Sequence, residues 1–152
     1  MPISAYLAGL RAKVGSDLIL VPSVSVIPRD DQGRVLLVRH VEDARWGLIG
    51  GAVDPGESPA AAAVREAEEE AGVTVRLGRI LTAVGGPDFE MTYANGDRCA
   101  YVAVIYDGTV VAGRPAPDEQ ETSEVAWFAE SSLDLVDLNH FARSVFADLR
   151  AR

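Results

Sequence analysis

The sequence predicts an α/β fold, more narrowly α+β, in which a mixed β-sheet is covered by helices on both faces. Segments with helical spacing lie at both ends and in the middle of the chain. Apolar runs typical of strands fill the stretches between them. With 152 residues, 48% of them hydrophobic and 24% charged, the chain can bury one core. We therefore expect a single domain over residues 1–152.

The first element is predicted to be a helix over residues 4–14. Ser4 can accept hydrogen bonds from the free amides of its first turn, and Gly15 can end it. One apolar face follows from helical spacing and consists of Leu7, Leu10 and Val14.

Strands are predicted to follow. Residues 18–21 and 24–27 are expected to form two strands with a bend or an edge between them, because Pro22 cannot donate to a ladder. Residues 30–33 form a turn, and the continuous apolar run within residues 34–39 indicates a strand buried on both faces.

The middle helix is predicted to begin at Ser58, where serine can cap free amides and the next residue, Pro59, suits the first helical position. Gly72 ends this helix. Its apolar residues form one thin stripe that can lie flat against a sheet: Ala60, Ala63, Val64, Ala67 and Ala71.

After this helix, residues 74–84, 99–107 and 125–128 are predicted to be strands. A turn over residues 94–97 separates the first two, and residues 114–121 form a polar loop that contains prolines. Asn139 can cap a final helix over residues 139–151, which has apolar residues at helical spacing.

The middle helix carries a cluster of acidic residues. Glu66, Glu69 and Glu70 lie at i, i+3 and i+4, so their carboxylates project into one small volume and repel each other. A divalent cation would relieve this repulsion, and Mg²⁺ prefers carboxylate oxygens. Arg65 can also relieve part of it by pairing with Glu69 one turn on. The alternative is an acidic helix face that is simply solvated.

A longer pattern surrounds these glutamates. It spans residues 51–73 and consists of Gly51, five residues, Glu57, seven residues, Arg65-Glu66, an aliphatic residue, one residue, Glu69-Glu70, one residue, Gly72 and an aliphatic residue. This pattern resembles the signature box of the Nudix hydrolases, with all seven fixed letters present. The resemblance implies a Nudix-like α/β/α sandwich with a central mixed sheet, and an enzyme that cleaves phosphate anhydrides. In many members a proline stands where this chain has Ile49, and a larger aliphatic residue stands at Ala67.

The resemblance also implies a metal site. Glu69 and Glu70 match the family's core ligands, and the carbonyl of Gly50 matches a backbone ligand. Glu66 matches a residue that either binds the metal or activates water. The implied cation is Mg²⁺, with Mn²⁺ as the alternative.

Two further roles come from the resemblance. Arg65 and Glu57 match a pair that braces the loop against the helix. A late-loop acid completes the site in many members, and Glu121 is the first choice because residues 124–128 resemble the strand that follows that acid. Glu119 is the reserve, and a solvated loop acid is the alternative for either.

The substrate is predicted less sharply. The first expectation is a nucleoside diphosphate linked to another group, such as ADP-ribose or a nucleotide sugar. The alternatives are a nucleoside triphosphate pyrophosphatase and a Nudix-fold sensor that binds a nucleotide without turnover. Pro87 resembles a downstream proline of ADP-ribose-cleaving members. Other candidate substrate contacts are aromatic (Trp46, Phe89 and Tyr93) or basic (Arg39, His40, Arg45 and Arg98).

Charge and composition limit the partners. The formal net charge of −9 argues against large nucleic acids, although a small polyphosphate can bind through a local metal. We find no apolar run long enough for a membrane span and no signal peptide, so we expect a cytoplasmic protein without a membrane partner. The lone Cys99 is expected to be a buried residue on a strand. The resemblance further implies a homodimer.

Overall fold

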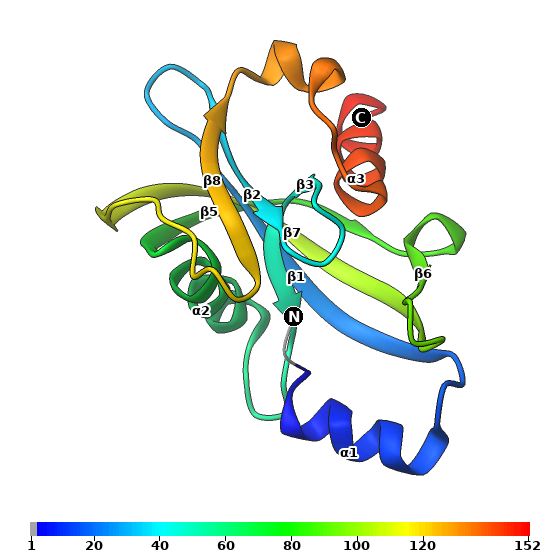
Figure 1. Ribbon diagram of the computed structural model, residues 1–152. Helices are drawn as coiled ribbons and strands as arrows, with labels where there is room; N and C mark the ends of the chain where they lie inside the picture. The colour runs from blue at the N-terminus through cyan, green and yellow to red at the C-terminus, as the bar shows by residue number, and fades with distance from the viewer. Residues whose placement is uncertain (1–2) are drawn as a thin grey trace.

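A computed structural model describes residues 3–152 (Figure 1). The helices are α1 (Ala5–Val14), α2 (Pro59–Ala71) and α3 (His140–Arg150), with short 3-10 turns at η1 (Pro87–Phe89) and η2 (Glu130–Leu135). The strands are β1 (Ile19–Pro28), β2 (Val35–His40), β3 (Trp46–Gly47), β4 (Ile49–Ala52), β5 (Val73–Val84), β6 (Glu90–Thr92), β7 (Arg98–Gly113) and β8 (Thr122–Phe128).

The strands form two sheets where a single one was expected. The larger has the order β4-β1-β7-β5, with β6 paired to β7. In it β1 runs parallel to β7 and antiparallel to β4, which confirms the predicted mixed sheet. The smaller sheet has the order β3-β2-β8 and is antiparallel.

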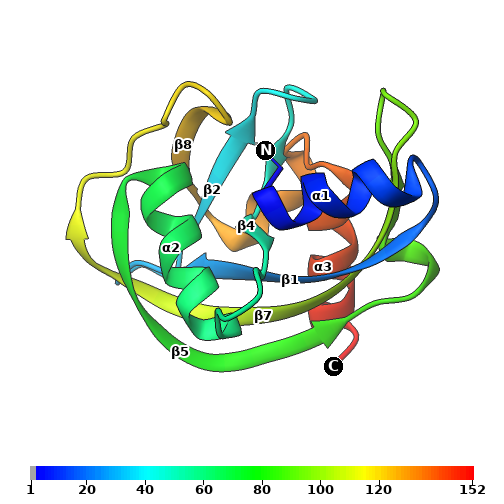
Figure 2. The same cartoon turned by 90° about the horizontal axis from the view of Figure 1, so that it is seen from below.

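Helices α2 and α3 cover opposite faces of these sheets (Figure 1), as predicted. Alternation along the strands explains this arrangement, because Val26 packs in the core beneath α2 while its neighbour Ile27 packs in the core beneath α3. Strand β2 contributes to both cores, so its four residues 35–38 are completely buried. Helix α1 lies apart from α2, beside the beginning of β1 (Figure 2). Within residues 3–152, no helix is long and apolar enough to cross a bilayer.

The prediction of two strands around Pro22 is wrong, since β1 is continuous from Ile19 to Pro28. The Pro22 carbonyl accepts a hydrogen bond from the Val53 amide, which follows β4. Because the N–H and C=O of one strand residue face the same side, the missing N–H of Pro22 also faces the β4 side, where it costs no bond to β7.

The buried stripe of α2 also differs from the prediction. Ala60 is exposed and Ala62 is buried in its place, next to Ala63 and Ala67. The helix is therefore rotated so that Glu66 faces the sheets, one turn beyond Ala62. The ends of α2 follow the prediction: Ser58 Oγ accepts the Ala61 amide, and Gly72 adopts a left-handed conformation with φ of 68°.

Candidate active site

Gly50 lies where β4 approaches β1 closely, next to helix α2, which carries most of the glutamates of the box. A Cβ at this position would lie 2.1 Å from the Val24 carbonyl oxygen, so only glycine fits. The Gly50 N–H donates to Glu70 Oε1 at 2.8 Å. Ile49 pairs with Val26 in the ladder, so strand pairing holds the backbone at the position where many relatives have proline.

Arg65 joins the box loop to the helix. Its Nε and Nη2 donate to the two carboxylate oxygens of Glu57 at 2.7 and 2.9 Å, and Nη2 also donates to the Ala52 carbonyl at 3.1 Å. Its Nη1 donates to Glu66 Oε1 at 2.9 Å and to Glu69 Oε2 at 3.2 Å. The bonds from Arg65 lower the pKa of Glu57 because they favour its charged form. The contacts predicted for Arg65 with Glu57 and with Glu69 are therefore formed.

Two of the three box carboxylates are buried. Glu66 is 3% exposed and Glu70 is 1% exposed, whereas Glu69 is exposed. Burial raises the pKa of Glu66 to about 7 and the pKa of Glu70 well above its ordinary value, and repulsion from neighbouring acids raises both further. Among the described residues, Glu66 Oε2 has no hydrogen-bond partner. The sequence predicted one crowded cluster, and the structure instead separates one exposed acid from two buried ones.

The late loop brings Glu121 toward this helix. Asp118 Oδ1 accepts the backbone N–H groups of residues 120, 121 and 122 at 3.0, 2.8 and 3.0 Å. Thr122 Oγ1 donates to the Glu70 carbonyl at 2.7 Å and so ties the loop to α2. Glu121 Oε2 is buried and finds no hydrogen-bond partner within residues 3–152. Burial raises the pKa of Glu121. Glu119, the reserve choice, is exposed and does not line the cavity described next.

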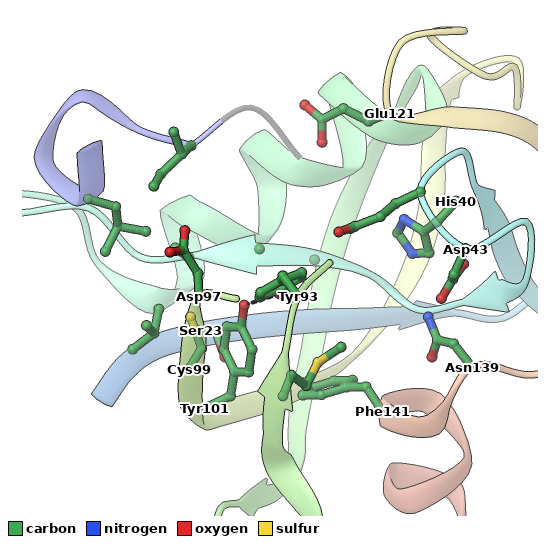
Figure 3. A pocket seen from close by; sticks show the side chains of 18 of the residues that line it. Ser23, His40, Asp43, Tyr93, Asp97, Cys99, Tyr101, Glu121, Asn139 and Phe141 are labelled. Atoms are coloured by element: carbon green, nitrogen blue, oxygen red, sulfur yellow. Dashed lines mark hydrogen bonds between the residues drawn. The ribbon is translucent and has the colours of Figure 1, made fainter. Parts of the chain in front are cut away.

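A cavity of about 550 Å³ opens beside these acids, within the size range of small-molecule sites. Gly50, Glu70 and Glu121 lie at one side of it. The sheet surface of β1 and β7 forms its floor, and α1, the β6–β7 hairpin and the beginning of α3 form its walls. Figure 3 shows Glu121 on the opposite side of this space from Tyr101 and Phe141. Glu70 of the box and Glu121 of the late loop therefore share one cavity, whereas Glu66 and Glu69 do not line it.

Only some of the predicted substrate contacts line the cavity. His40 and Tyr93 line the cavity, and His40 Nδ1 lies 3.9 Å from Glu70 Oε2. The other candidates lie elsewhere: Trp46 and Phe89 pack in the core, Arg39 and Arg45 pair with Glu124 and Asp137, and Pro87 and Arg98 are exposed. Cys99 is buried on β7, as expected, and also lines the cavity.

Sequence reasoning missed several cavity residues. Ser23 and Ser25 line its floor, and Tyr101 and Phe141 come from β7 and α3. A signal was present in β1, where serine alternates with valine over residues 23–26, because period-two alternation gives a strand one polar face. Nothing local marks Tyr101 or Phe141, because only the tertiary fold brings them to this space.

The donor set suits a hard divalent cation. Glu66 and Glu121 each present a buried carboxylate oxygen without a partner, and such an oxygen is costly unless a cation or a donor meets it. The glycine at position 50 lets β4 come close to β1, and its N–H donates to Glu70 Oε1. Within residues 3–152, no three acidic, histidine or cysteine side chains already converge on one point.

Comparisons with known proteins agree with this geometry. The family model described as NUDIX domain matches residues 19–149. The chain is 31% identical over 110 residues to a putative 8-oxo-dGTP diphosphatase of Bacillus subtilis (strain 168), covering 72% of this chain and 67% of the relative. It is 31% identical over 111 residues to the nucleoside triphosphatase NudI of Enterobacter sp. (strain 638), covering 71% and 78%. The crystal structure of a MutT protein from Methanosarcina mazei Go1 matches with a TM-score of 0.73 and 27% identity, over 89% of this chain and 96% of that one.

Proposed function

The chain belongs to the Nudix family of hydrolases that act on phosphate anhydrides, and on this premise we propose that it cleaves nucleoside triphosphates to nucleoside monophosphates and inorganic pyrophosphate. One water is consumed. Its oxygen bonds to phosphorus, the P–O bond between the α and β phosphates breaks, and a carboxylate takes the proton. The observation that carries this proposal is a cavity of nucleotide size lined by Glu70 and Glu121, with Glu66 close to both acids.

We propose that Glu66, Glu69, Glu70 and the Gly50 carbonyl hold Mg²⁺ or Mn²⁺. When bound, such a cation neutralises phosphate charge and lowers the pKa of attacking water. The partnerless oxygen of Glu66 supports this assignment. Glu69 is shared with Arg65, so Arg65 would release that carboxylate when a cation takes it.

Arg65 and Glu57 are proposed to brace these ligands. Their paired hydrogen bonds fix the box loop to α2, and the bond from Arg65 to the Ala52 carbonyl extends the brace to β4. The side chains that hold phosphate and cation are then oriented before the substrate arrives, which lowers the reorganisation needed during the reaction.

The proton acceptor is proposed to be Glu121. Glu66 has one oxygen held by Arg65, whereas Glu121 stands on the loop that faces the cavity and makes no salt bridge among the described residues. Glu121→Gln should then lower kcat at saturating Mg²⁺ and leave the Mg²⁺ dependence unchanged. If the variant instead recovers its kcat at higher Mg²⁺ concentrations, Glu121 is a ligand and Glu66 becomes the candidate base.

Two lines of support favour triphosphates over the ADP-ribose or nucleotide sugar expected from the sequence. Both curated relatives described above are named for triphosphate substrates. Pro87, the residue that suggested ADP-ribose, is exposed and does not line the cavity. A homodimer and a cytoplasmic location stay predictions, and sedimentation velocity tests the former.

A product assay tests the function. The protein is incubated with Mg²⁺ and a panel of nucleoside triphosphates, ADP-ribose, nucleotide sugars and dinucleoside polyphosphates, and the products are separated. We expect pyrophosphate from triphosphates and no cleavage of ADP-ribose. Glu69→Gln should reduce the rate by at least about a hundredfold. The matched control is Glu68→Gln, an exposed neighbour on the same helix, which should keep the rate.

Other outcomes would replace the proposal. Cleavage of ADP-ribose or a nucleotide sugar with triphosphates untouched restores the first expectation from the sequence. Tight nucleotide binding without any turnover supports the sensor. A Glu69→Gln protein as active as the parent refutes the assignment of the box as the metal site.

A further inference from the structure

The late loop, residues 114–121, and the first residue of β8 close the end of helix α2. The last carbonyl groups of a helix have no partner within the helix. In α2 two of them find partners here. Thr122 Oγ1 donates to the Glu70 carbonyl at 2.7 Å, and the Ala116 N–H donates to the Ala71 carbonyl at 2.9 Å. The chain beside the late loop is therefore bonded to the same residue of α2 whose carboxylate lines the cavity.

Thr122 is completely buried, with 0% of its surface exposed. A valine would fill the same space without a polar group and suits a strand equally well, so packing alone does not require a threonine. The Thr122 hydroxyl also accepts the Asp118 N–H at 3.3 Å, and Asp118 in turn holds the backbone of residues 120–122. This one hydroxyl therefore joins the turn of the late loop to the end of α2.

The Glu121 side chain depends on its backbone for its position. Its Oε2 is buried and has no hydrogen-bond partner among the described residues. Its backbone N–H donates to Asp118 Oδ1 at 2.8 Å, and its carbonyl accepts the Val41 N–H at 2.9 Å. Because no partner fixes the carboxylate itself, a shift of the loop would move it relative to Glu70 across the cavity that both line (Figure 3).

Proton transfer depends on such a distance. A general base must lie within hydrogen-bond reach of the water that it deprotonates, and a misplacement of about 1 Å can cost about a hundredfold in rate. In the proposed function the acids of the box place the water, and Glu121 takes its proton. The bond from Thr122 to the Glu70 carbonyl links these two parts of the site directly.

We propose that Thr122 is a positioning residue, whose hydroxyl holds Glu121 at its working distance from Glu70. This inference rests on the proposed function, in which Glu121 is the proton acceptor. Thr122 contacts no substrate and acts only through Glu121. Loss of its hydroxyl should therefore lower kcat and leave KM unchanged.

Steady-state kinetics test this role with whichever compound of the product panel the protein cleaves. Thr122→Val should lower kcat at least about tenfold at saturating Mg²⁺ and change KM less than about twofold. Thr122→Ser keeps the hydroxyl and should keep kcat within about threefold of the parent. Thr122→Ala also lacks the hydroxyl and should show the same loss, so it replaces valine if that variant does not fold. A loss that higher Mg²⁺ concentrations reverse would overturn the proposal, because Thr122 would then serve cation binding.

Thr82→Val is the matched control for stability. Thr82 is 4% exposed and donates to Asp148 Oδ2 at 2.8 Å, so this variant also removes one buried hydroxyl with one good hydrogen bond. Thr82 does not line the cavity. Thr122→Val and Thr82→Val should each lower the melting temperature by roughly 2–8 °C, and Thr82→Val should keep kcat. An equal loss of kcat in both variants would reduce Thr122 to a structural residue.

A double variant shows whether Thr122 acts through Glu121. Once Glu121→Gln has removed the base, adding Thr122→Val should lower kcat by less than about twofold further. Two residues that contribute independently would instead multiply their losses. A further loss as large as that of Thr122→Val alone would overturn the inference.

Amide hydrogen exchange tests the hydroxyl without turnover. Exchange over residues 114–122 should be faster in Thr122→Val than in the parent, and unchanged in Thr122→Ser and Thr82→Val. Unchanged exchange in Thr122→Val would refute the inference. The two proposals fail separately: a protein that cleaves no compound of the panel refutes the proposed function while exchange still shows whether Thr122 holds the loop, and an active protein with the parent's kcat in Thr122→Val refutes the role of Thr122 alone.

Discussion

Glu66→Gln should stabilise the metal-free protein at neutral pH. Burial raises the pKa of Glu66 to about 7 from its ordinary 4.5. Because the folded state holds the proton more tightly, ionising Glu66 destabilises the fold, and about 1.4 kcal/mol per pKa unit gives about 3 kcal/mol. This penalty is absent below pH 4.5, grows as the pH rises toward 7 and is constant above. Glutamine removes the charge and keeps an oxygen for Arg65.

Urea denaturation in EDTA measures this effect. Glu66→Gln should gain less than about 1 kcal/mol of unfolding free energy at pH 5 and about 3 kcal/mol at pH 8. Glu68→Gln, exposed on the same helix, should change little at either pH. Saturating Mg²⁺ should reduce the advantage of Glu66→Gln, since the cation stabilises only a protein that binds it. A gain that is equal at pH 5 and pH 8, or a loss at pH 8, would refute the reasoning.

Three further predictions concern the support around the acids. Arg65→Ala should lower the unfolding free energy by about 2–4 kcal/mol, because it leaves the buried Glu66 carboxylate without its counter-ion. The control, Arg79→Ala at an exposed position on β5, should lower it by less than about 0.5 kcal/mol. Equal losses in the two variants would argue against the brace. Gly50→Ala should destabilise by at least about 3 kcal/mol in urea denaturation because its Cβ would collide with backbone, whereas Gly9→Ala, with open space in α1, should stabilise by about 0.5–1 kcal/mol. Asp118→Asn should lower the unfolding free energy by about 1 kcal/mol at pH 7. Burial raises the pKa of Asp118, but hydrogen bonds from three backbone N–H groups outweigh it and lower that pKa below 3.8. The difference between variant and parent should therefore vanish as the pH falls below 3.8, and a difference that persists there would contradict this cause.

Local signals predicted much of the fold. The ends of α2 follow from Ser58 and Gly72, and the caps of α1 and α3 from Ser4 and Asn139, because capping depends on residues next to each other in the chain. The error at Pro22 has a non-local cause. Which side of a strand lacks a partner depends on where the neighbouring strand ends, and the sequence of β1 alone does not contain that information.

In the candidate site, too, contacts with a local cause could be predicted from the sequence and those with a non-local cause could not. The motif placed Arg65 and Glu69 four residues apart on one helix, so their hydrogen bond follows from helical spacing. It did not reveal that Glu69 would be exposed, since the rotation of α2 is set by packing on two sheets. Ser23 reaches the cavity only through long-range pairing of β1, which spacing cannot predict.

Cation binding at the acids beside the cavity tests the central claim most directly. Mn²⁺ titration followed by electron paramagnetic resonance measures binding without substrate or turnover. We expect the parent and Glu68→Gln to bind Mn²⁺ with the same affinity and Glu70→Gln to bind it at least about tenfold more weakly. Equal Mn²⁺ affinity in all three proteins would contradict the account.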